Sequence, residues 1–534
     1  MADMNAVFRP ALSPEPRFVA LSEGALILGL QFLLLAFRLG DIPLLGPDEP
    51  RYARVAAEMA RVDEFVTPTL GGEAWLEKPP LYYWLAGLGF RLLGENEMAA
   101  RWPAVLAALL MTGFTGLVGA RLFGRRCGRL AMIIMATSPL AFAYGRAATM
   151  DALVAAFITG ASGLFVLSNL GIAGPSAVPA AWALMAIAVL AKGPIGFVLP
   201  LGVAVVAGLA ATRLRLSRLV SPLGIALGAG IAGPWFVAIY LDQGLHFIEV
   251  FILNHNLERF TSTIHNHPGP VYYYLPVLLL GVFPWSGLIA PAIAGMAAME
   301  RRPVVSILSW ILLPLAIFSL AGSKLPGYIV PCLPPFAILL ALSARVLDSP
   351  EHRRAARTAG LFGLIISAAV VAFAIRGMRQ GEPWGRSALT PALWLLATTF
   401  AASRALDRAR HEGFRILTIG ASGFLLLLTL VAPPVLEAME SGRRLFIPAH
   451  GREVLVVGAW RTAWMSGYFY NDGKVREIAS LERALELVGD EPRLMLFGPS
   501  QWSEVRTSDR HTCLELARGP RGNVLARVST RSSH

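Results

Sequence analysis

The chain has 534 residues, of which 55% are hydrophobic and 15% charged, and its formal net charge is +12. Soluble domains contain roughly 25% charged residues, whereas here apolar stretches recur from Leu21 to Val431, each about 20 residues long and able to cross a hydrocarbon core of roughly 30 Å. These features exclude a soluble enzyme. The positive charge does not indicate nucleic-acid binding, because cytoplasmic loops of membrane proteins collect arginine and lysine.

The beginning of the chain predicts a retained first membrane span. Residues 1–19 are polar and rich in proline, without the n-region, h-region and cleavage site of a signal peptide. Apolar windows then predict a transmembrane domain over residues 20–435 with about 13 spans. The spans lie near residues 20–39, 99–119, 130–145, 150–169, 179–191, 194–211, 220–240, 271–297, 304–321, 326–345, 358–375, 388–403 and 415–434.

Arginine placement predicts the orientation of these spans. Alternate loops are rich in arginine and, by the positive-inside rule, are cytoplasmic. With an odd number of spans, the N-terminus is then cytoplasmic and the C-terminus lies outside. The arginine-rich loops contain Arg121, Arg125, Arg126 and Arg129; Arg213, Arg215 and Arg218; Arg301 and Arg302; Arg345, Arg353, Arg354 and Arg357; and Arg404, Arg408, Arg410 and Arg415.

Two outer segments and the C-terminal region are too polar to span a membrane. Residues 40–98 have amphipathic character, and residues 241–270 are rich in histidine, asparagine and aromatic residues. Residues 436–534 are expected to form a small α/β domain outside the cytoplasm, toward the smaller end of the usual domain range. Its predicted strands start at Leu455, Val475 and Arg493, around a helix at 480–489.

Acidic residues lie at the outer ends of two predicted spans. Asp48 and Glu49 follow the first span, and Asp151 opens the fourth. A carboxylate near the bilayer is costly without a partner, which makes it a functional-site candidate. The structural alternative for Asp48 is a helix N-cap, since Asp is a favoured cap and Pro50 fits a first turn, but two adjacent acids exceed what a cap needs. For Asp151 the structural and functional interpretations are equally open.

The chain contains only four lysines, and the other fixed cations are arginines. Lys78, Lys192 and Lys324 lie in predicted outer loops, each beside proline or glycine. A compact ammonium group is a point-charge partner for phosphate. The alternative is that an arginine-rich composition leaves a few lysines in loops by chance. Three lysines on one membrane face favour phosphate binding.

A third polar cluster lies in the segment 241–270. It contains Asn254-His255-Asn256 and Arg259, and aromatic residues follow at 272–274. Histidines at this density could bind a metal, but no HxxxH or HExxH spacing defines a ligand set. Interfacial aromatic residues are expected in any case as membrane anchors. The segment is better interpreted as part of a polar pocket beneath an outer loop.

The outer face therefore combines carboxylates, lysines, arginines and aromatic residues at the bilayer surface. A carboxylate can take a proton from an acceptor or orient it, and cations can neutralise a leaving phosphate. Apolar walls between spans could receive a lipid chain. These properties predict transfer of a group from a lipid phosphate to an acceptor outside the cytoplasm.

The motifs at these positions resemble those of a known family. The runs Asp48-Glu-Pro-Arg-Tyr-Ala-Arg and Glu77-Lys-Pro-Pro-Leu-Tyr-Tyr-Trp are similar to the first outer loop of the ArnT-like branch of the family 39 glycosyltransferases. This branch contains bacterial aminoarabinose transferases and is related to the protein O-mannosyltransferases. Further matches follow in order at Met150-Asp151, Lys192-Gly-Pro, Arg259-Phe260, Tyr272-Tyr273-Tyr274-Leu275-Pro276, Pro284-Trp285 and Ser323-Lys-Leu-Pro-Gly-Tyr-Ile-Val-Pro-Cys332.

The resemblance implies a GT-C fold in the bacterial inner membrane, with 13 spans, amphipathic juxtamembrane helices and a C-terminal periplasmic domain. It implies an undecaprenyl-phosphate-linked sugar donor and inversion at the anomeric carbon. The acceptor would be a lipid A-like glycolipid, another glycan or a protein. Asp48 would be the catalytic carboxylate, with Asp151 a second acid and Glu49 in a supporting position. Donor binding would involve Arg51, Tyr52, Lys78, Tyr82, Lys192, Arg259, Lys324 and Tyr328.

The resemblance also suggests a divalent metal, Zn or Mg, near Glu77. In the aminoarabinose transferases that this chain resembles, a His-Glu-His pattern precedes the Arg-Phe pair. This chain has Asn254-His255-Asn256 at that place. One expected ligand is missing, so a metal would retain only Glu77 and His255 of that set. The same departure leaves the sugar and the acceptor open.

Two alternatives belong to other classes of protein. A transporter or flippase of a polar or lipid-linked glycan would need ionisable residues near mid-bilayer and interrupted spans in corresponding halves. The charges lie instead at the outer rim, and no internal repeat is visible. A non-catalytic scaffold would use the C-terminal domain as its binding module, but the set of outer-loop motifs argues against it. In that domain, Trp464, Tyr468, Phe469 and Tyr470 could face a partner, although a place in the core is the favoured interpretation.

Overall fold

The computed structural model describes residues 17–211, 215, 218–251, 269–347, 353–408, 410–489 and 491–531. Two residues of the expected site, His255 and Arg259, lie outside these ranges together with most of the segment 241–270.

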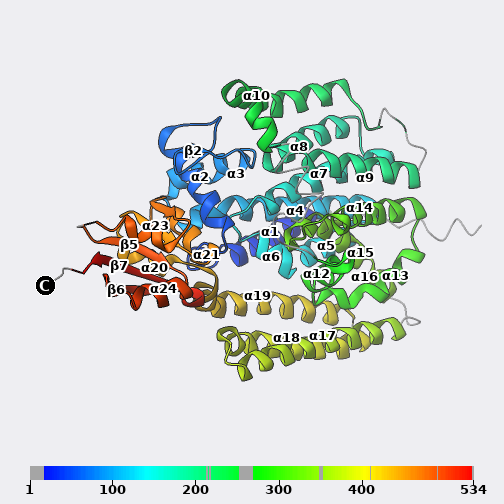
Figure 1. Cartoon of the computed structure of the whole chain (residues 1–534). Coiled ribbons are helices and arrows are strands. Elements are labelled where there is room, and N and C mark those ends of the chain that lie inside the picture. The colour runs from blue at the N-terminus through cyan, green and yellow to red at the C-terminus, as the bar shows by residue number, and fades with distance from the viewer. Residues whose placement is uncertain are drawn as a thin grey trace, which may run out of the picture.

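Helices make up most of the described chain up to residue 440, and a mixed sheet follows (Figure 1). The first half contains α1 (Arg17–Ala36), α2 (Asp48–Val62), α3 (Leu81–Leu93), α4 (Glu97–Phe123), α5 (Arg125–Ala136), α6 (Pro139–Tyr144), α7 (Asp151–Asn169), α8 (Ala177–Lys192), α9 (Ile195–Ala211) and α10 (Pro222–Phe247). The second half contains η3 (Val271–Tyr273), α12 (Tyr274–Gly281), η4 (Trp285–Leu288), α13 (Ile289–Ala297), α14 (Arg301–Leu320), η5 (Pro326–Cys332), α15 (Leu333–Ala341), α16 (Ser343–Leu347), α17 (Arg353–Arg379), α18 (Pro383–Arg408) and α19 (Arg410–Glu440).

Each predicted span coincides with a helix or a group of adjoining helices. In the described part of the chain, seven helices are long and apolar enough to cross a membrane, or eight if a bent pair counts as one span. Shorter apolar helices occur in α1, α8 and α9. The chain is therefore a multi-pass helical membrane protein. The total of 13 stays a prediction, because the remaining windows fall on α5 with α6 and on α18, which do not reach that length or hydropathy.

Two predicted spans are broken near proline instead of forming one straight helix. In residues 130–145, α5 ends before a new helix starts at Pro139. In residues 271–297, the two halves meet at Pro284 and are bent by 101°. Proline has no N–H to donate and its ring clashes with the preceding turn, so a helix ends or kinks there.

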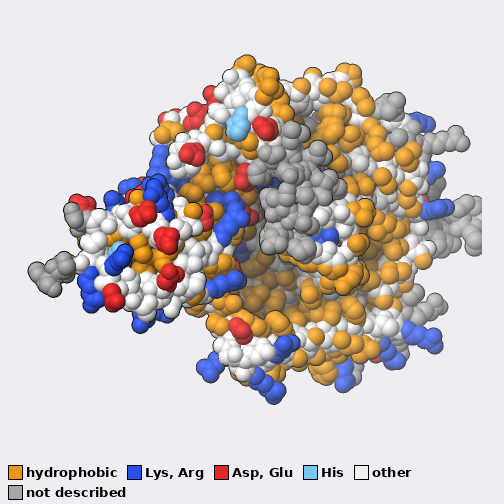
Figure 2. All heavy atoms as spheres, viewed as in Figure 1, with side chains coloured by type: hydrophobic (Ala, Val, Ile, Leu, Met, Phe, Trp, Pro, Cys, Tyr) orange, Lys and Arg blue, Asp and Glu red, His pale blue; other side chains and the backbone are white. Residues whose placement is uncertain are grey.

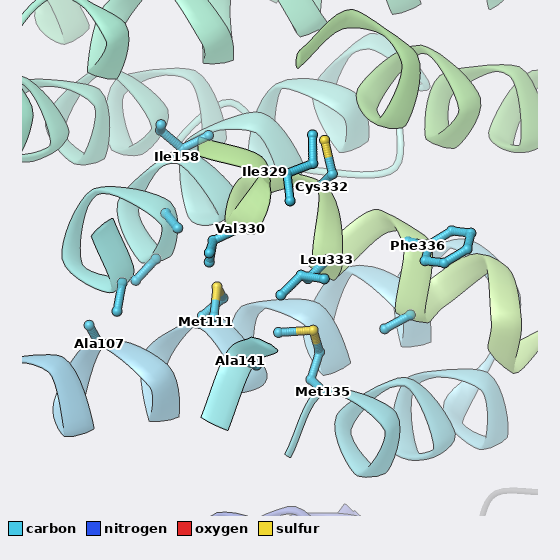
Figure 3. Packing of buried hydrophobic residues seen from close by; sticks show 14 of the residues in the cluster. Ala107, Met111, Met135, Ala141, Ile158, Ile329, Val330, Cys332, Leu333 and Phe336 are labelled. Atoms are coloured by element: carbon cyan, nitrogen blue, oxygen red, sulfur yellow. The ribbon is translucent and has the colours of Figure 1, made fainter. Parts of the chain in front are cut away.

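The membrane helices pack through small and apolar side chains. Figure 3 shows Met111 of α4 close to Val330 and Leu333 in one buried cluster. Between α4 and α5, a Cβ placed on Gly128 would lie 2.4 Å from the carbonyl oxygen of Gly116. Glycine at this contact lets the two backbones approach closely, as is common between membrane helices.

The surface agrees with a bilayer around the helical body. Figure 2 shows apolar side chains over most of that body, whereas Lys and Arg side chains gather on the C-terminal region and at the opposite end of the molecule. Such a distribution is expected when the outer surface of the helices faces lipid and the charged loops face water.

The region after α19 forms a five-stranded mixed sheet with short helices around it. The strand order is β4-β3-β5-β7-β6; β3 runs parallel to β4 and β5, and β7 runs antiparallel to β5 and β6. The three predicted strands and the helix between them are confirmed, but the last two strands were not predicted. The elements are α20 (Arg443–Phe446), η7 (Ile447–Ala449), β3 (Val454–Val457), α21 (Arg461–Met465), α22 (Gly467–Tyr470), β4 (Val475–Glu477), α23 (Leu481–Glu486), β5 (Arg493–Phe497), α24 (Pro499–Arg506), β6 (His511–Arg518), η8 (Pro520–Gly522) and β7 (Val524–Thr530).

The outer segment 40–98 folds into two helices joined by a short hairpin. The hairpin pairs β1 (Thr69–Leu70) with β2 (Glu73–Ala74) in antiparallel register. Helix α2 starts directly after Pro47 with two acids in its first turn, where the helix dipole favours negative charge. Helix α3 starts after two prolines and ends at Gly94, whose φ of 78° suits glycine.

Candidate active site

Asp48 and Glu49 open α2, but their side chains meet different surroundings. Successive residues of an α-helix are turned by about 100°. The Asp48 side chain is 45% exposed and forms an ion pair with Arg51, one turn further along the helix. Glu49 is 5% exposed. Of the two acids, Asp48 is the one accessible to a bound substrate.

Glu49 is held inside the protein by three hydrogen-bond donors. Its Oε2 accepts from the guanidinium of Arg101 at 2.6 Å and from the backbone N–H of Leu45 at 2.9 Å. Its Oε1 accepts from the backbone N–H of Ala148 at 2.9 Å. Arg101 is itself 1% exposed and also donates to backbone carbonyls of the loop before α2. These contacts tie α2 to α4 and to the loop before α7, which places Glu49 in a supporting position.

The substitution Arg101→Met is expected to lower the free energy of unfolding by about 3–5 kcal/mol, because it leaves the carboxylate of Glu49 buried without its cation. Thermal unfolding of the purified protein in detergent measures the change. The double substitution Arg101→Met with Glu49→Gln removes both charges and should recover part of the loss. An unchanged unfolding temperature for Arg101→Met alone would contradict this prediction.

A pocket with both charged and apolar lining lies where α7, α8, α9, α14 and η5 meet. Its lining comes from the loop before α3 and from the facing ends of these helices. It is lined by Glu77, Lys78, Asp151, Val154, Ile158, Lys192, Ile195, Leu199, Phe318, Ala321, Ser323, Gly327, Tyr328 and Pro331. The structure thus brings together five residues of the expected site: Glu77, Lys78, Asp151, Lys192 and Tyr328.

Lys192 and Asp151 form an ion pair in the pocket. Lys192 is the last residue of α8 and Asp151 the first of α7, and their Nζ and Oδ1 atoms are 2.5 Å apart. Each charge lies at the helix end that its sign favours. The ammonium group also lies 5.2 Å from the ring centre of Tyr328. Gly193 follows with a φ of 80°, and a Cβ there would lie 2.6 Å from Phe251, so this turn requires glycine.

Lys78 enters the same pocket from the outer segment. It is 8% exposed, and its ammonium group donates to the backbone carbonyl of Glu77 at 3.0 Å. Two prolines follow directly and lead into α3. The backbone before a proline is restricted to extended conformations, which limits how far the Lys78 side chain can move.

Ser323 is a pocket residue that sequence analysis did not single out. It is 2% exposed, and its Oγ has no hydrogen-bond partner within the described ranges. A buried hydroxyl without a partner costs about 1–3 kcal/mol, so an unpaired one that lines a pocket indicates a ligand position. The one sequence signal was its place beside Lys324 in a motif shared with the family.

Six described residues of the expected site lie outside the pocket lining: Asp48, Glu49, Arg51, Tyr52, Tyr82 and Lys324. The ammonium of Lys324 donates to the carbonyl of Ala321 in its own loop at 2.7 Å. Tyr82 is fully buried, and its hydroxyl donates to the carbonyl of Ala100 at 2.9 Å. The ring of Tyr52 packs edge-on against Tyr82, with centres 6.3 Å apart. Both tyrosines thus pack against each other inside the outer segment, between α2 and α3, instead of lining the pocket.

Arg51 links Asp48 electrostatically to the pocket. Its guanidinium is largely buried and lies 5.2 Å from the ring centre of Trp75. Burial lowers the pKa of Arg51, but the neighbouring Tyr52, Asp48 and Glu77 raise it, and the pKa stays above its ordinary value. Arg51 is therefore a permanent cation that interacts both with Asp48 and with Glu77 of the pocket.

The described residues do not assemble a metal-binding cluster. Within these ranges no group of three or more His, Cys, Asp or Glu side chains is placed to hold an ion. Glu77 and Asp151 both line the pocket, but Asp151 is already paired with Lys192. His255 lies outside the described residues. The suggested metal therefore gains no support from the residues that are described.

Comparison with known proteins places the chain among membrane glycosyltransferases. Residues 77–237 match the family model for dolichyl-phosphate-mannose-protein mannosyltransferases. Three relatives carry the name undecaprenyl phosphate-alpha-4-amino-4-deoxy-L-arabinose arabinosyl transferase. The Aeromonas hydrophila protein is 31% identical, and the match covers 68% of each chain. The Pectobacterium carotovorum protein is 29% identical over 80% of this chain and 79% of its own. The Yersinia enterocolitica protein is 29% identical, and the chain spans 65% of that relative's length.

The fold matches a solved structure along almost its whole length. The crystal structure of ArnT from Cupriavidus metallidurans bound to undecaprenyl phosphate superposes with a TM-score of 0.76 at 23% identity. The match covers 96% of this chain and 98% of that one. At this identity the solved structure shows the fold, and the Aeromonas relative shows the family. The chain belongs to the ArnT-like family of GT-C membrane glycosyltransferases.

Proposed function

We propose that this chain transfers a sugar from an undecaprenyl-phosphate-linked donor to a periplasmic acceptor in the bacterial inner membrane. The observation that carries the proposal is the pocket in which Lys78 and Lys192 meet apolar side chains of α7 and α9. Ammonium groups beside an apolar wall suit a phosphate that is joined to a polyprenyl chain. The related ArnT structure, which has the same fold, was solved bound to undecaprenyl phosphate.

The lysines would act on the donor phosphate. As the sugar leaves, negative charge grows on the phosphate oxygen, and ammonium groups held in place stabilise it without reorganisation. Asp151 keeps Lys192 pointed into the pocket through their ion pair. The phosphate would therefore bind between Lys78 and Lys192, with the polyprenyl chain along Val154, Ile158 and Leu199.

Asp48 would act on the acceptor. An acceptor hydroxyl attacks the anomeric carbon from the face opposite the phosphate, the bond from that carbon to the phosphate oxygen breaks, and undecaprenyl phosphate leaves with the bonding electron pair. The configuration at the anomeric carbon is then inverted. The hydroxyl proton would pass to the carboxylate of Asp48, which is ion-paired with Arg51. If the acceptor is itself a phosphate, no proton moves and Asp48 only positions it.

The acceptor class is a lipid A-like glycolipid, another glycan or a protein. Because the relatives are named for 4-amino-4-deoxy-L-arabinose, the undecaprenyl phosphate ester of this pentose is the first donor to test. Purified protein in proteoliposomes should convert it to undecaprenyl phosphate and glycosylated acceptor in equal amounts, measured by mass spectrometry. Mass spectra of envelope glycoconjugates with and without the gene then identify the natural acceptor. Movement of the donor across the bilayer without a new glycosidic bond would instead show a transporter.

Ser323→Ala is expected to raise the KM for the donor about tenfold with a smaller effect on kcat. The buried Ser323 hydroxyl lines the pocket and would donate a hydrogen bond to the donor phosphate, and hydrogen bonds to charged groups contribute about 1.5–3 kcal/mol. Steady-state kinetics with varied donor concentration measure the change. Ser323→Thr keeps the hydroxyl and should retain most of the affinity. An unchanged KM in Ser323→Ala would remove Ser323 from the phosphate site.

A further inference from the structure

The C-terminal region contacts the outer segment through residues 468–473, here called the docking segment. Its Phe469 ring lies 6.2 Å from the ring of Phe90 in α3, and Phe469 and Tyr470 pack against the main apolar cluster of the membrane domain. Trp464, by contrast, belongs to the core of the C-terminal sheet. Figure 1 shows the C-terminal region beside α2 and α3. Trp464 therefore lies in the core of the C-terminal sheet, whereas Phe469 and Tyr470 contact the membrane domain.

Tyr470 holds the loop that leads into α2. Its hydroxyl accepts a hydrogen bond from the backbone N–H of Leu44 at 2.7 Å and donates to Glu97, the first residue of α4, at 3.0 Å. Two residues later in the loop, the N–H of Gly46 donates to the carbonyl of Glu440 at 3.1 Å. The loop directly before the proposed catalytic acid is thus hydrogen-bonded once to the C-terminal region and once to the end of α19.

Asp472 holds α2 itself. Its carboxylate forms ion pairs with Arg54 and with Arg61, the second at 2.7 Å. These arginines lie about two helical turns apart on α2. In the first ion pair Arg54 is 11% exposed and Asp472 is 48% exposed, so only the arginine is shielded from water. One acid of the docking segment therefore contacts both the middle and the end of the helix that begins at Asp48.

From Arg54 the contacts continue to the β-hairpin. Arg54 donates to Glu58 at 2.6 Å, and the Glu58 carboxylate also accepts from the hydroxyl of Thr69 and the backbone N–H groups of Gly71 and Gly72, at 2.8–3.2 Å. The hairpin leads directly into the loop that carries Trp75, Glu77 and Lys78. The docking segment is thereby connected both to the helix that begins at Asp48 and to the loop that carries Lys78.

We infer that Asp472 and Tyr470 are positioning residues for sugar transfer: they hold α2 and the hairpin so that Asp48 and Lys78 meet the bound substrates in register. The inference rests on the proposed function. Reacting groups must be held within about 0.5 Å of productive geometry, and a displacement of about 1 Å can cost about a hundredfold in rate. Lys192, Asp151 and Tyr328 come from elements outside this set of contacts, so donor binding depends less on it.

The test is the kinetics of Asp472→Asn in the full-length protein with the donor ester named above. This change removes the charge at constant size, and kcat should fall about 10- to 100-fold while the KM for the donor changes less than about threefold. Asp472→Glu keeps the charge and should recover most of kcat. The matched control is Glu486→Gln, which removes an exposed ion pair with Arg483 in the same domain and should leave kcat unchanged.

Tyr470→Phe keeps the ring and its packing, removes only the two hydrogen bonds, and should lower kcat by about three- to tenfold. It keeps the inference testable if Asp472→Asn does not fold. Unchanged kcat in Tyr470→Phe and Asp472→Asn would overturn the inference. A kcat that falls only in proportion to the loss of folded protein, without rescue by Asp472→Glu, would also overturn it. Absence of transfer in the unsubstituted protein would instead overturn the proposed function.

Discussion

Asp48→Asn is expected to lower kcat for a hydroxyl acceptor by about 10²–10⁴-fold, the usual contribution of a general base. The amide has nearly the shape of the carboxylate but cannot take the proton that the acceptor loses. The hydroxyl group of the acceptor could still donate a hydrogen bond to the amide oxygen of the new asparagine. The KM for the acceptor should therefore change less than kcat. Initial rates of glycosylated product at saturating donor measure the effect.

The acceptor class decides how large this loss is. A phosphate acceptor carries no proton to remove, so Asp48→Asn should then cost only the positioning contribution. Asp63→Asn is the matched control, since it makes the same chemical change at the other end of α2, where the side chain is 74% exposed and the φ is 55°. Asparagine tolerates this left-handed conformation. Full activity of Asp48→Asn with both acceptor classes would remove Asp48 from the reaction.

Lys78→Met is expected to lower kcat/KM for the donor by about 10²–10³-fold, the usual loss when one stabilising donor is removed from a developing anion. Methionine keeps the apolar stem of the side chain, so the pocket wall should stay packed while the charge is lost. Binding of undecaprenyl phosphate should weaken as well, because in the proposed site Lys78 would also contact the phosphate of this product. Kinetics with varied donor and equilibrium binding of undecaprenyl phosphate measure the two effects.

The chain offers a natural control for this substitution. Lys474 is the fourth lysine of the chain and does not belong to the three in predicted outer loops. It is exposed on the C-terminal region and does not line the described part of the pocket. Lys474→Met should leave both the kinetics and undecaprenyl phosphate binding unchanged. Equal effects of Lys78→Met and Lys474→Met would indicate a general loss of surface charge and would contradict a specific phosphate contact.

The membrane class and the positions of the spans were predictable because hydropathy is a local property of the chain. The breaks near Pro139 and Pro284 were not predicted, although proline marks both positions, since a window average does not register a single residue. The strands β6 and β7 were also missed. The burial of β6 residues alternates only over the first half of the strand, before a register shift between Glu515 and Ala517, so period-two patterning is weak there.

The site was predictable in part. Lysine scarcity and placement singled out Lys78 and Lys192, and both line the pocket. The same argument singled out Lys324, whose ammonium group is bound to a carbonyl of its own loop. Residue type and predicted membrane topology could not distinguish the two pocket lysines from Lys324. The direction of a side chain depends on the backbone conformation of its loop, which only the structure gives. Ser323 was missed because a serine in a loop carries no signal until its burial is known.

The sequence by itself determined that the protein is a polytopic membrane protein of this family, with acids and lysines at the ends of apolar spans. Those conclusions depend on hydropathy, charge and motifs, which are all local. Only the tertiary structure decided that Glu49 faces Arg101 while Asp48 faces solvent, that Lys78 and Lys192 share one pocket, and that Asp472 holds α2. Apart from Asp48, each of these contacts joins residues that lie far apart in sequence, and it exists because packing of whole helices and domains brings the two side chains together.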